Sequence, residues 1–181
     1  MEGAFALNAF NKLTRARRNR KYRRRIKHWD GVRIVAEGDS WFQYPLILKD
    51  TIDQLIDTNN FQYAIYGLSE AVYLLSNIIR EDEISEAMER ENPDVFLING
   101  GGNDMVSDGR AATLAHKFSA NRKPKNYPNE NFATFLEELE RLYRGLLSRL
   151  LADRPYLKII CHGYDNVIWQ HGPWLGKPLC K

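Results

Sequence analysis

Three short polar stretches carry the residue types that acyl-transfer chemistry requires. They are residues 38–40 (Gly-Asp-Ser), Gly67, and residues 100–104 (Gly-Gly-Gly-Asn-Asp). A serine hydroxyl can attack a carbonyl carbon, and backbone N–H groups and an asparagine amide can stabilise the oxyanion that forms. Ser40 is therefore the candidate nucleophile, and the N–H groups of Ser40 and Gly67 and the Asn103 amide are candidate oxyanion donors. Taken singly, each stretch is equally typical of an ordinary turn between a strand and a helix.

The elements around these stretches predict where they lie. Apolar segments indicate strands at 32–37, 61–66, 94–99 and 156–161, and helical patterns occupy 46–58, 69–80, 81–91 and 132–151 between them. Ser69 is expected to cap the second of these helices. Strands that alternate with helices predict an α/β fold with a parallel sheet and right-handed crossovers. Because parallel strands end at one edge, the three polar stretches are expected to converge there.

The composition is that of an ordinary globular protein. Its 181 residues suit one domain, and 44% of them are hydrophobic. No apolar run reaches the length of a membrane span, and arginines follow the mildly apolar first ten residues, unlike the order in a secretory signal. The two cysteines, Cys161 and Cys180, form no disulfide or metal-binding pattern. These features predict a cytoplasmic protein without a transmembrane segment or a metal site.

Positive charge is concentrated near the N-terminus. Between Lys12 and Lys27 lie ten Lys or Arg residues and no acidic residue, whereas residues 29–181 contain 16 basic and 22 acidic residues. This contrast divides the chain into a basic N-terminal arm, residues 1–28, and a body, residues 29–181. The arm is predicted either to bind a polyanion or acidic surface through residues 12–27, or to be a solvated helix or tether. An apolar stripe is expected to dock its helical turns on the body: Phe5, Ala9, Leu13 and Ala16.

In their strand context, the three stretches resemble those of the SGNH (GDSL-type) hydrolases. Residues 38–41 are similar to the first block of the branch that reads Gly-Asp-Ser-Trp, Gly67 to the second-block glycine, and residues 101–104 to the third block, Gly-x-Asn-Asp. The resemblance covers residues 30–181. It implies a flavodoxin-like three-layer α/β/α sandwich. It also implies that Ser40 cleaves an ester of a small molecule, lipid or carbohydrate, without a cofactor, using an oxyanion hole of Ser40, Gly67 and Asn103.

The late part of the chain departs from that family, which carries its catalytic Asp and His in an Asp-x-x-His block. None of the four histidines here has an aspartate three residues before it, and a serine hydroxyl without a base is a weak nucleophile. Three explanations stay open. The chain is truncated or frame-shifted before that block, or His162 or His171 substitutes as the base with Asp165 nearby, or the site is inactive and kept for binding. His162 is the better substitute because it ends the fourth strand, on the edge where Ser40 lies. Asp39 is expected to hydrogen-bond within its turn rather than to act as a base.

Two classes of function follow. The first is a serine esterase or acyl-hydrolase of SGNH type. The alternative is a catalytically impaired SGNH-like binding module, tethered to nucleic acid or an acidic surface by its basic arm. A nucleotide-binding flavodoxin-like domain is disfavoured, because the chain contains neither Gly-x-Gly-x-x-Gly nor a Walker loop.

Overall fold

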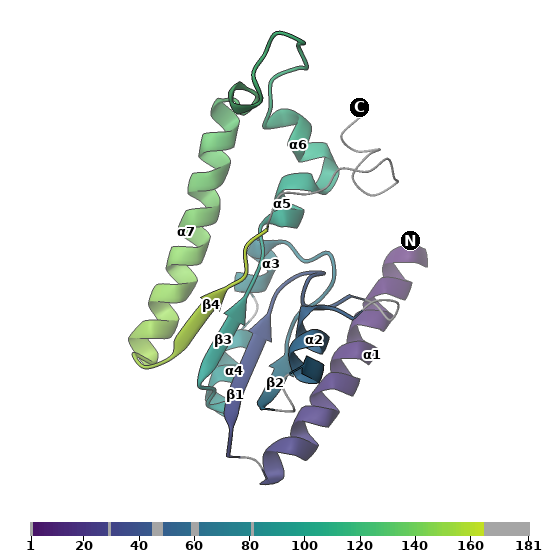
Figure 1. Cartoon of the computed structure of the whole chain (residues 1–181), viewed down its shortest axis with the longest axis vertical. Helices are drawn as coiled ribbons and strands as arrows, with labels where there is room; N and C mark the ends of the chain where they lie inside the picture. Colours follow the sequence, from purple (N-terminus) through teal and green to yellow (C-terminus); the bar gives the residue numbers. More distant parts are fainter. Residues whose placement is uncertain (1, 29, 45–48, 59–61, 81, 165–181) are drawn as a thin grey trace.

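The structure is a computed structural model of the chain, and it describes residues 2–28, 30–44, 49–58, 62–80 and 82–164. Within these residues the centre of the fold is a four-stranded parallel sheet, whose strands are β1 (Val32–Glu37), β2 (Tyr63–Gly67), β3 (Val95–Ile98) and β4 (Lys158–Cys161). The strand order is β2-β1-β3-β4 (Figure 1). These are the first four positions of a flavodoxin-like sheet. The predicted α/β fold with a parallel sheet is therefore confirmed.

Helices cover both faces of the sheet. On one face, α2 (Thr51–Thr58) packs against β1, where Ile34 and Ala36 meet Ile52. On the other face lie α3 (Leu75–Arg80), α4 (Glu83–Glu91) and α7 (Glu130–Asp153). The core on this side consists mainly of strand residues and the helix residues that cover them: Val35, Phe96, Ile98, Ile78, Met88, Leu146 and Leu150. Successive strand residues alternate between the two cores, so the three-layer sandwich follows from the period of two along each strand.

The N-terminal helix α1 (Glu2–Arg25), followed by the short helix η1 (Ile26–His28), runs along the edge strand β2 (Figure 1). The Asn19 side chain donates to the Gly67 carbonyl at 2.8 Å and accepts from the Gly67 N–H at 2.9 Å. Arg25 donates to the Tyr63 carbonyl at 2.7 Å. An edge strand presents unpaired backbone groups, and α1 satisfies them with polar side chains.

The apolar docking stripe predicted for α1 is wrong. Ala9 and Ala16 are exposed and Leu13 is 68% exposed, while the Phe5 side chain lies outside the described part of the chain. The buried residues of α1 are instead polar or aromatic: Asn11, Arg18 and Tyr22. The face that docks is polar because it meets loop and edge-strand backbone, whose hydrogen-bonding groups need partners. The helix is packed on the body and is not a free tether.

The helix predicted over 69–80 begins only at Leu75, so residues 68–74 form a loop. Ser69 is not a helix cap, since its hydroxyl donates to the Ala36 carbonyl at 3.4 Å. The Leu68 N–H also donates to Ala36 O, at 2.8 Å, and the Glu70 N–H donates to Gly38 O at 3.1 Å. These bonds continue the β1–β2 pairing and hold the loop against the turn that follows β1. The helix predicted over 46–58 is observed from Thr51, and residues 46–48 lie outside the described residues.

The connection from β3 to α7 stands above the carboxyl edge of the sheet (Figure 1). It contains α5 (Gly102–Val106), η2 (Ser107–Gly109), α6 (Arg110–Thr113) and η3 (Pro124–Asn126). The Asn129 side chain accepts from the Asn131 and Phe132 N–H groups, at 3.0 and 3.3 Å, and so caps the start of α7.

Over the described ranges, no helix combines the length and the apolar character that crossing a bilayer demands.

Candidate active site

β1 ends in a tight turn that places Ser40 at the carboxyl edge of the sheet. The Phe42 and Gln43 N–H groups both donate to the Asp39 carbonyl at 3.0 Å and close this turn. Asn99, just after β3, reaches across and accepts from the Asp39 N–H at 2.9 Å through its side-chain oxygen. A Cβ at Gly38 would lie 1.8 Å from that same oxygen. Glycine is therefore required at position 38 by the close approach of Asn99.

Asp39 is a hydrogen-bonding residue of the turn, as predicted. Its side chain is buried, and one carboxylate oxygen accepts from the Trp41 N–H at 3.1 Å and from the Asn99 side chain at 3.0 Å. The other oxygen accepts from the Tyr164 hydroxyl. Because both oxygens are engaged by donors, this carboxylate orients the turn rather than accepting a proton from Ser40.

The Ser40 hydroxyl faces the loop of residues 68–74. Its oxygen accepts a hydrogen bond from the Val72 N–H at 3.3 Å. Val72 has a φ of +72°, a conformation that β-branched residues rarely adopt. The Ser40 N–H makes no hydrogen bond to any other described residue. The turn thus offers a hydroxyl and a backbone donor side by side.

Asn103, in α5, lies on the other side of the same loop. Its side-chain nitrogen donates to the Tyr73 carbonyl at 2.9 Å, and an amide nitrogen carries a second hydrogen. Since Val72 and Tyr73 are consecutive, the structure brings Ser40 and Asn103 to neighbouring residues of one loop. Ser40 follows β1 and Asn103 follows β3, and the strand order reverses direction between these two strands. Open α/β sheets bind ligands at such a switch point.

Among the described residues, no hydrogen bond links Gly67 to Ser40. It is the last residue of β2, where it pairs with Ala36, and its N–H donates to Asn19 of α1. The loop N–H that reaches the Ser40 hydroxyl belongs to Val72, five residues later. The prediction placed the donor at Gly67 because a glycine lets a substrate approach the backbone closely, and because Gly67 is similar to the second-block glycine of the SGNH hydrolases.

His162 follows β4 and packs beside the turn that carries Ser40. Its N–H donates to the Ile98 carbonyl at 2.8 Å. Its ring centroid lies 5.8 Å from that of Trp41 and 5.7 Å from that of Phe42. The ring nitrogen Nδ1 is buried and has no hydrogen-bond partner among the described residues. The other residues considered for the base, Asp165 and His171, lie outside the described part of the chain.

The phenols of Tyr143 and Tyr164 and the carboxyl of Asp104 flank the site. Burial, and then the hydrogen bond to Asp39, raises the pKa of Tyr164, and burial raises the pKa of Tyr143, whose hydroxyl donates to the Gly100 carbonyl at 3.1 Å. Both phenols are therefore protonated donors at neutral pH. Burial also raises the pKa of Asp104, which accepts from the Leu75 N–H at 2.8 Å and anchors the start of α3.

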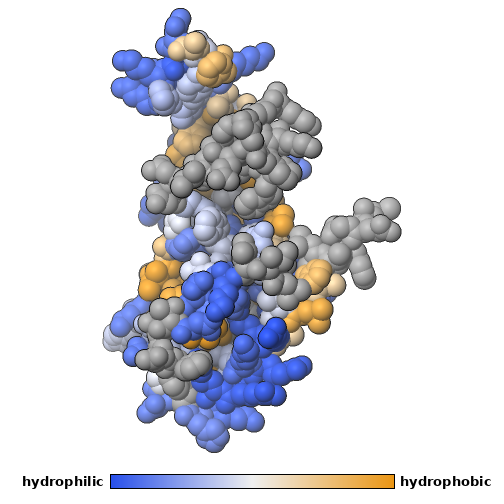
Figure 2. All heavy atoms as spheres, turned by 45° about the vertical axis from the view of Figure 1, so that its right-hand side comes forward, coloured by the Kyte–Doolittle hydropathy of each residue, from blue (hydrophilic) through white to orange (hydrophobic). Residues whose placement is uncertain are grey.

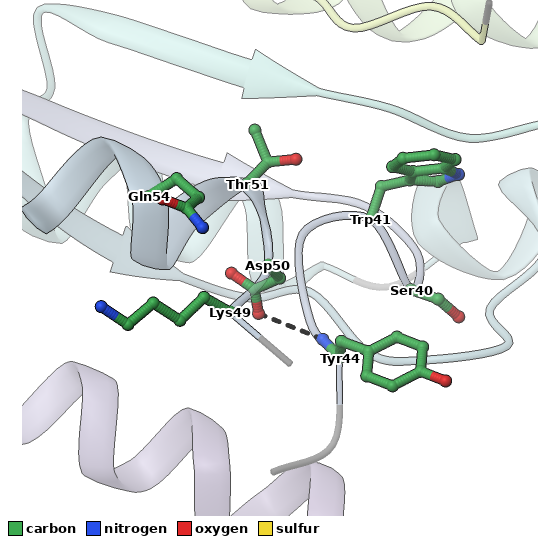
Figure 3. A pocket seen from close by; sticks show the side chains of 7 residues that line it. All are labelled: Ser40, Trp41, Tyr44, Lys49, Asp50, Thr51 and Gln54. Carbon is green, nitrogen blue, oxygen red and sulfur yellow. Dashed lines mark hydrogen bonds between the residues drawn. The ribbon is translucent and has the colours of Figure 1, made fainter. Parts of the chain in front are cut away.

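A cavity of about 310 Å³ opens beside Ser40 (Figure 3). Its walls come from the turn after β1 and from the start of α2: Ser40, Trp41, Tyr44, Lys49, Asp50, Thr51 and Gln54. The rings of Trp41 and Tyr44 are partly exposed, and the Tyr44 N–H donates to Asp50 at 3.1 Å, which joins the two walls. The cavity offers an aromatic surface next to the candidate nucleophile.

No group of three His, Cys, Asp or Glu side chains within the described ranges is arranged to hold a metal ion.

Two residues that shape the site, Val72 and Asn11, carry no signal of that role in the amino-acid sequence. Val72 is β-branched, so nothing in the sequence indicates a positive φ there. Asn11 lies in the basic helix, and it hydrogen-bonds to Ala71 in the site loop. A third, Asn99, carried a signal that could have been used, because a polar residue between a buried strand and a glycine run is unusual.

Comparison of the chain with protein-family models gave no match, and comparison with curated proteins gave none either. Among solved structures, the chain is similar to a family 3 carbohydrate esterase from Clostridium thermocellum, with 15% identity and a TM-score of 0.48, over 83% of this chain and 67% of that one. It is also similar to a GDSL-like lipase from Parabacteroides merdae (17% identity, TM-score 0.39, 72% and 58% covered). The acetyl xylan esterase AlAXEase is a third such structure (18% identity, TM-score 0.41, 72% and 57% covered). The chain thus spans little more than half of the last two structures. Similarity this low carries no argument about chemistry.

Proposed function

We propose that this chain is a serine esterase or acyl-hydrolase of SGNH type with Ser40 as its nucleophile. The observation that carries the proposal is that Ser40 and Asn103 meet on one loop. The Ser40 hydroxyl lies 3.3 Å from the Val72 nitrogen, and the Asn103 amide lies 2.9 Å from the Tyr73 oxygen. Acyl transfer needs a nucleophile and a donor for the oxyanion, and here a hydroxyl and a side-chain amide lie together at one edge of the sheet.

In the proposed reaction, the Ser40 oxygen bonds to the ester carbonyl carbon and its proton passes to a base. The carbonyl electron pair moves onto the oxygen, and this oxyanion accepts from the Ser40 N–H and from the second N–H of Asn103. Collapse of this intermediate restores the carbonyl and expels the alcohol, which takes up a proton. Water then attacks the acyl-serine and releases the acid. We assign the third donor to the Val72 N–H, because it already lies 3.3 Å from the Ser40 oxygen that bonds to the reacting carbon, whereas the Gly67 N–H is directed at Asn19 of α1.

Among the described residues, no base is hydrogen-bonded to the Ser40 hydroxyl. His162 is the candidate within the described residues, since its ring packs against Trp41 and Phe42 and its Nδ1 lacks a partner. A positioned base contributes about 10²–10⁴-fold to such reactions, while oxyanion donors alone retain part of the rate enhancement. We therefore expect this chain to hydrolyse activated esters only feebly.

The cavity beside Ser40 is proposed to hold an apolar part of the ester. Trp41 and Tyr44 supply aromatic surface, and ligand sites of this kind are lined mainly by apolar groups. The substrate class that fits is an ester with a hydrophobic acyl or alcohol group.

The test is hydrolysis of p-nitrophenyl acetate by the whole chain and three variants, Ser40→Ala, Asn103→Ala and His162→Ala. Ser40→Ala is expected to abolish the slow wild-type turnover. The exposed Ser148 on α7 gives a matched control. Ser148→Ala makes the same chemical change away from the site and should leave the rate of hydrolysis unchanged. A loss in His162→Ala as large as in Ser40→Ala identifies His162 as the base, whereas a nearly unchanged rate means that His162 is not the base. Turnover that survives Ser40→Ala removes the proposal.

A second candidate function, binding to a polyanion, is favoured by how the charges of α1 are divided. Arg15, Arg18 and Arg23 form ion pairs within the fold. The other side of the helix keeps exposed basic residues: Arg17, Arg20, Lys21 and Arg24, followed by Lys27 in η1. Figure 2 shows hydrophilic side chains gathered over the lower part of the molecule, where the C-terminal half of α1 lies. A cationic helix face of this kind suits a polyanion bound through counterion release.

A further inference from the structure

α1 meets the candidate site through one polar face. Arg15 donates to the Leu68 carbonyl at 2.9 Å, and Arg18 donates to the Phe42 carbonyl at 2.7 Å. Asn11, one turn before Arg15, is 3% exposed and continues this face. The helix therefore binds the two segments that carry Val72 and Ser40.

Asn11 fixes both backbone groups of Ala71. Its side-chain oxygen accepts from the Ala71 N–H at 3.2 Å, and its side-chain nitrogen donates to the Ala71 carbonyl at 3.4 Å. That carbonyl belongs to the same planar peptide unit as the Val72 N–H. The Val72 N–H, in turn, donates to the Ser40 hydroxyl. Because this peptide unit is planar and rigid, a hydrogen bond that holds the Ala71 carbonyl also sets the direction of the Val72 N–H.

Asn11 also touches the segment on the Ser40 side. Its backbone carbonyl accepts from the Gln43 side chain at 2.8 Å, and Gln43 is 1% exposed. The Gln43 N–H donates to the Asp39 carbonyl and so closes the turn that presents Ser40. One residue of α1 is thus bonded to both sides of the contact between Ser40 and Val72.

We propose that Asn11 is a positioning residue, which holds the Val72 N–H on the Ser40 hydroxyl through the peptide unit between Ala71 and Val72. The expected effect of Asn11 on the reaction rate of Ser40 rests on the proposed function, whereas its effect on the position of the Val72 N–H does not. Asn11 acts through Val72 and does not itself touch the reacting atoms.

The test uses the full chain with Asn11→Ala and with Asn11→Leu, which is similar in volume and keeps the packing. Asn8→Ala is the matched control, because Asn8 is an exposed amide residue on the same helix. Two quantities are measured on folded protein: amide hydrogen exchange at Ala71 and Val72, and the rate at which an alkyl fluorophosphonate reacts with Ser40. Losing such hydrogen bonds is expected to speed exchange there by about tenfold, with residues 95–98 of β3 unchanged. The reaction at Ser40 is expected to slow by a similar factor, and Asn8→Ala to match the wild type in both.

Unchanged exchange at Ala71 and Val72 in a folded Asn11→Leu variant overturns the proposal. Faster exchange with an unaltered Ser40 rate also overturns it, since Asn11 would then support only the loop. If wild-type Ser40 does not react with the probe, the proposed function fails instead. The exchange measurement alone then decides whether Asn11 holds the Val72 N–H.

Discussion

The Ser40 hydroxyl oxygen lies 3.3 Å from the backbone nitrogen of Val72, a residue held at a φ of +72°. A β-branched residue in the left-handed region is strained, and such strain persists only where surrounding contacts maintain it. Here those contacts come from Asn11 on one side and Asn103 on the other, through Ala71 and Tyr73. The strained residue is therefore the point where the N-terminal helix, the β1 turn and α5 meet.

Replacing Val72 by glycine should relieve this strain. Glycine adopts positive φ without steric cost, and this gain exceeds its larger loss of chain entropy, so the free energy of unfolding should rise by about 1 kcal/mol. Urea denaturation of Val72→Gly measures the change. Val72→Ala is the control, because it keeps a Cβ in the same backbone conformation. If alanine stabilises as much as glycine, the positive φ is not the source of the gain.

Arg18 should be one of the most important residues of α1 for stability. Its guanidinium lies 2.7 Å from an Asp50 carboxylate oxygen, and the Asp50 side chain is 1% exposed. Arg18→Ala leaves that carboxylate buried without its cation, which typically costs about 3–5 kcal/mol. The neighbouring Arg17 is exposed, so Arg17→Ala should change the free energy of unfolding by less than about 0.5 kcal/mol. Equal effects of the two variants in urea denaturation would show that α1 is not docked through Arg18.

Polyanion binding should depend on the exposed basic residues of α1 and not on those that form ion pairs within the fold. Changing Arg17, Arg20 and Arg24 to alanine should weaken binding to duplex DNA and reduce its salt dependence, because fewer counterions are released. Fluorescence anisotropy at two salt concentrations measures both. Lys117, Lys123 and Lys125, exposed residues between α6 and α7, supply a control triple variant of equal charge change. Wild-type binding that does not vary with salt would reject the cationic face as the binding surface.

Asp104 should make stability decrease as pH rises through the weakly acidic range. Burial raises the pKa of this carboxyl in the folded chain above its unfolded value, so the folded state binds the proton more tightly. The contribution is then present below the unfolded pKa and is lost as pH rises through the folded pKa. Asp104→Asn keeps an acceptor for the Leu75 N–H but does not titrate, so the wild-type free energy of unfolding should fall relative to it as pH increases. A wild-type free energy of unfolding that rises relative to that of Asp104→Asn as pH increases would contradict this prediction.

The sequence predicted the sheet well and the loop after β2 poorly, for physical reasons. The strands could be predicted because each buries a whole face of apolar side chains, and such burial leaves a regular pattern in the sequence. Val35 and Phe96 are examples, since both are fully buried in the core. The segment 69–74 has helix-forming composition, but the Ser69 hydroxyl donates to the Ala36 carbonyl and the Glu70 N–H donates to the Gly38 carbonyl instead. Tertiary hydrogen bonds overrode local propensity there, as they commonly do.

The same limit applies to the site. Ser40 and Asn103 could be placed from the glycine-containing turns that follow two buried strands. The loop N–H that contacts the Ser40 hydroxyl could not be identified, because which N–H it is depends on the path of a loop that local sequence does not encode. Likewise, the charge of residues 12–27 indicated a surface feature, whereas Asn19 and Arg25 act on the edge of β2.

The most direct test of the central claim is to treat the whole chain with an alkyl fluorophosphonate and map the adduct by peptide mass spectrometry. Attack by the Ser40 oxygen forms an O–P bond and expels fluoride, while the hydroxyl proton passes to the base or to water, so an activated serine gains one alkylphosphonyl group. The account predicts a single adduct on Ser40, formed slowly and absent from Ser40→Ala, with exposed serines such as Ser148 unmodified. An unmodified Ser40 in folded protein, or equal labelling of Ser40 and Ser148, would contradict it.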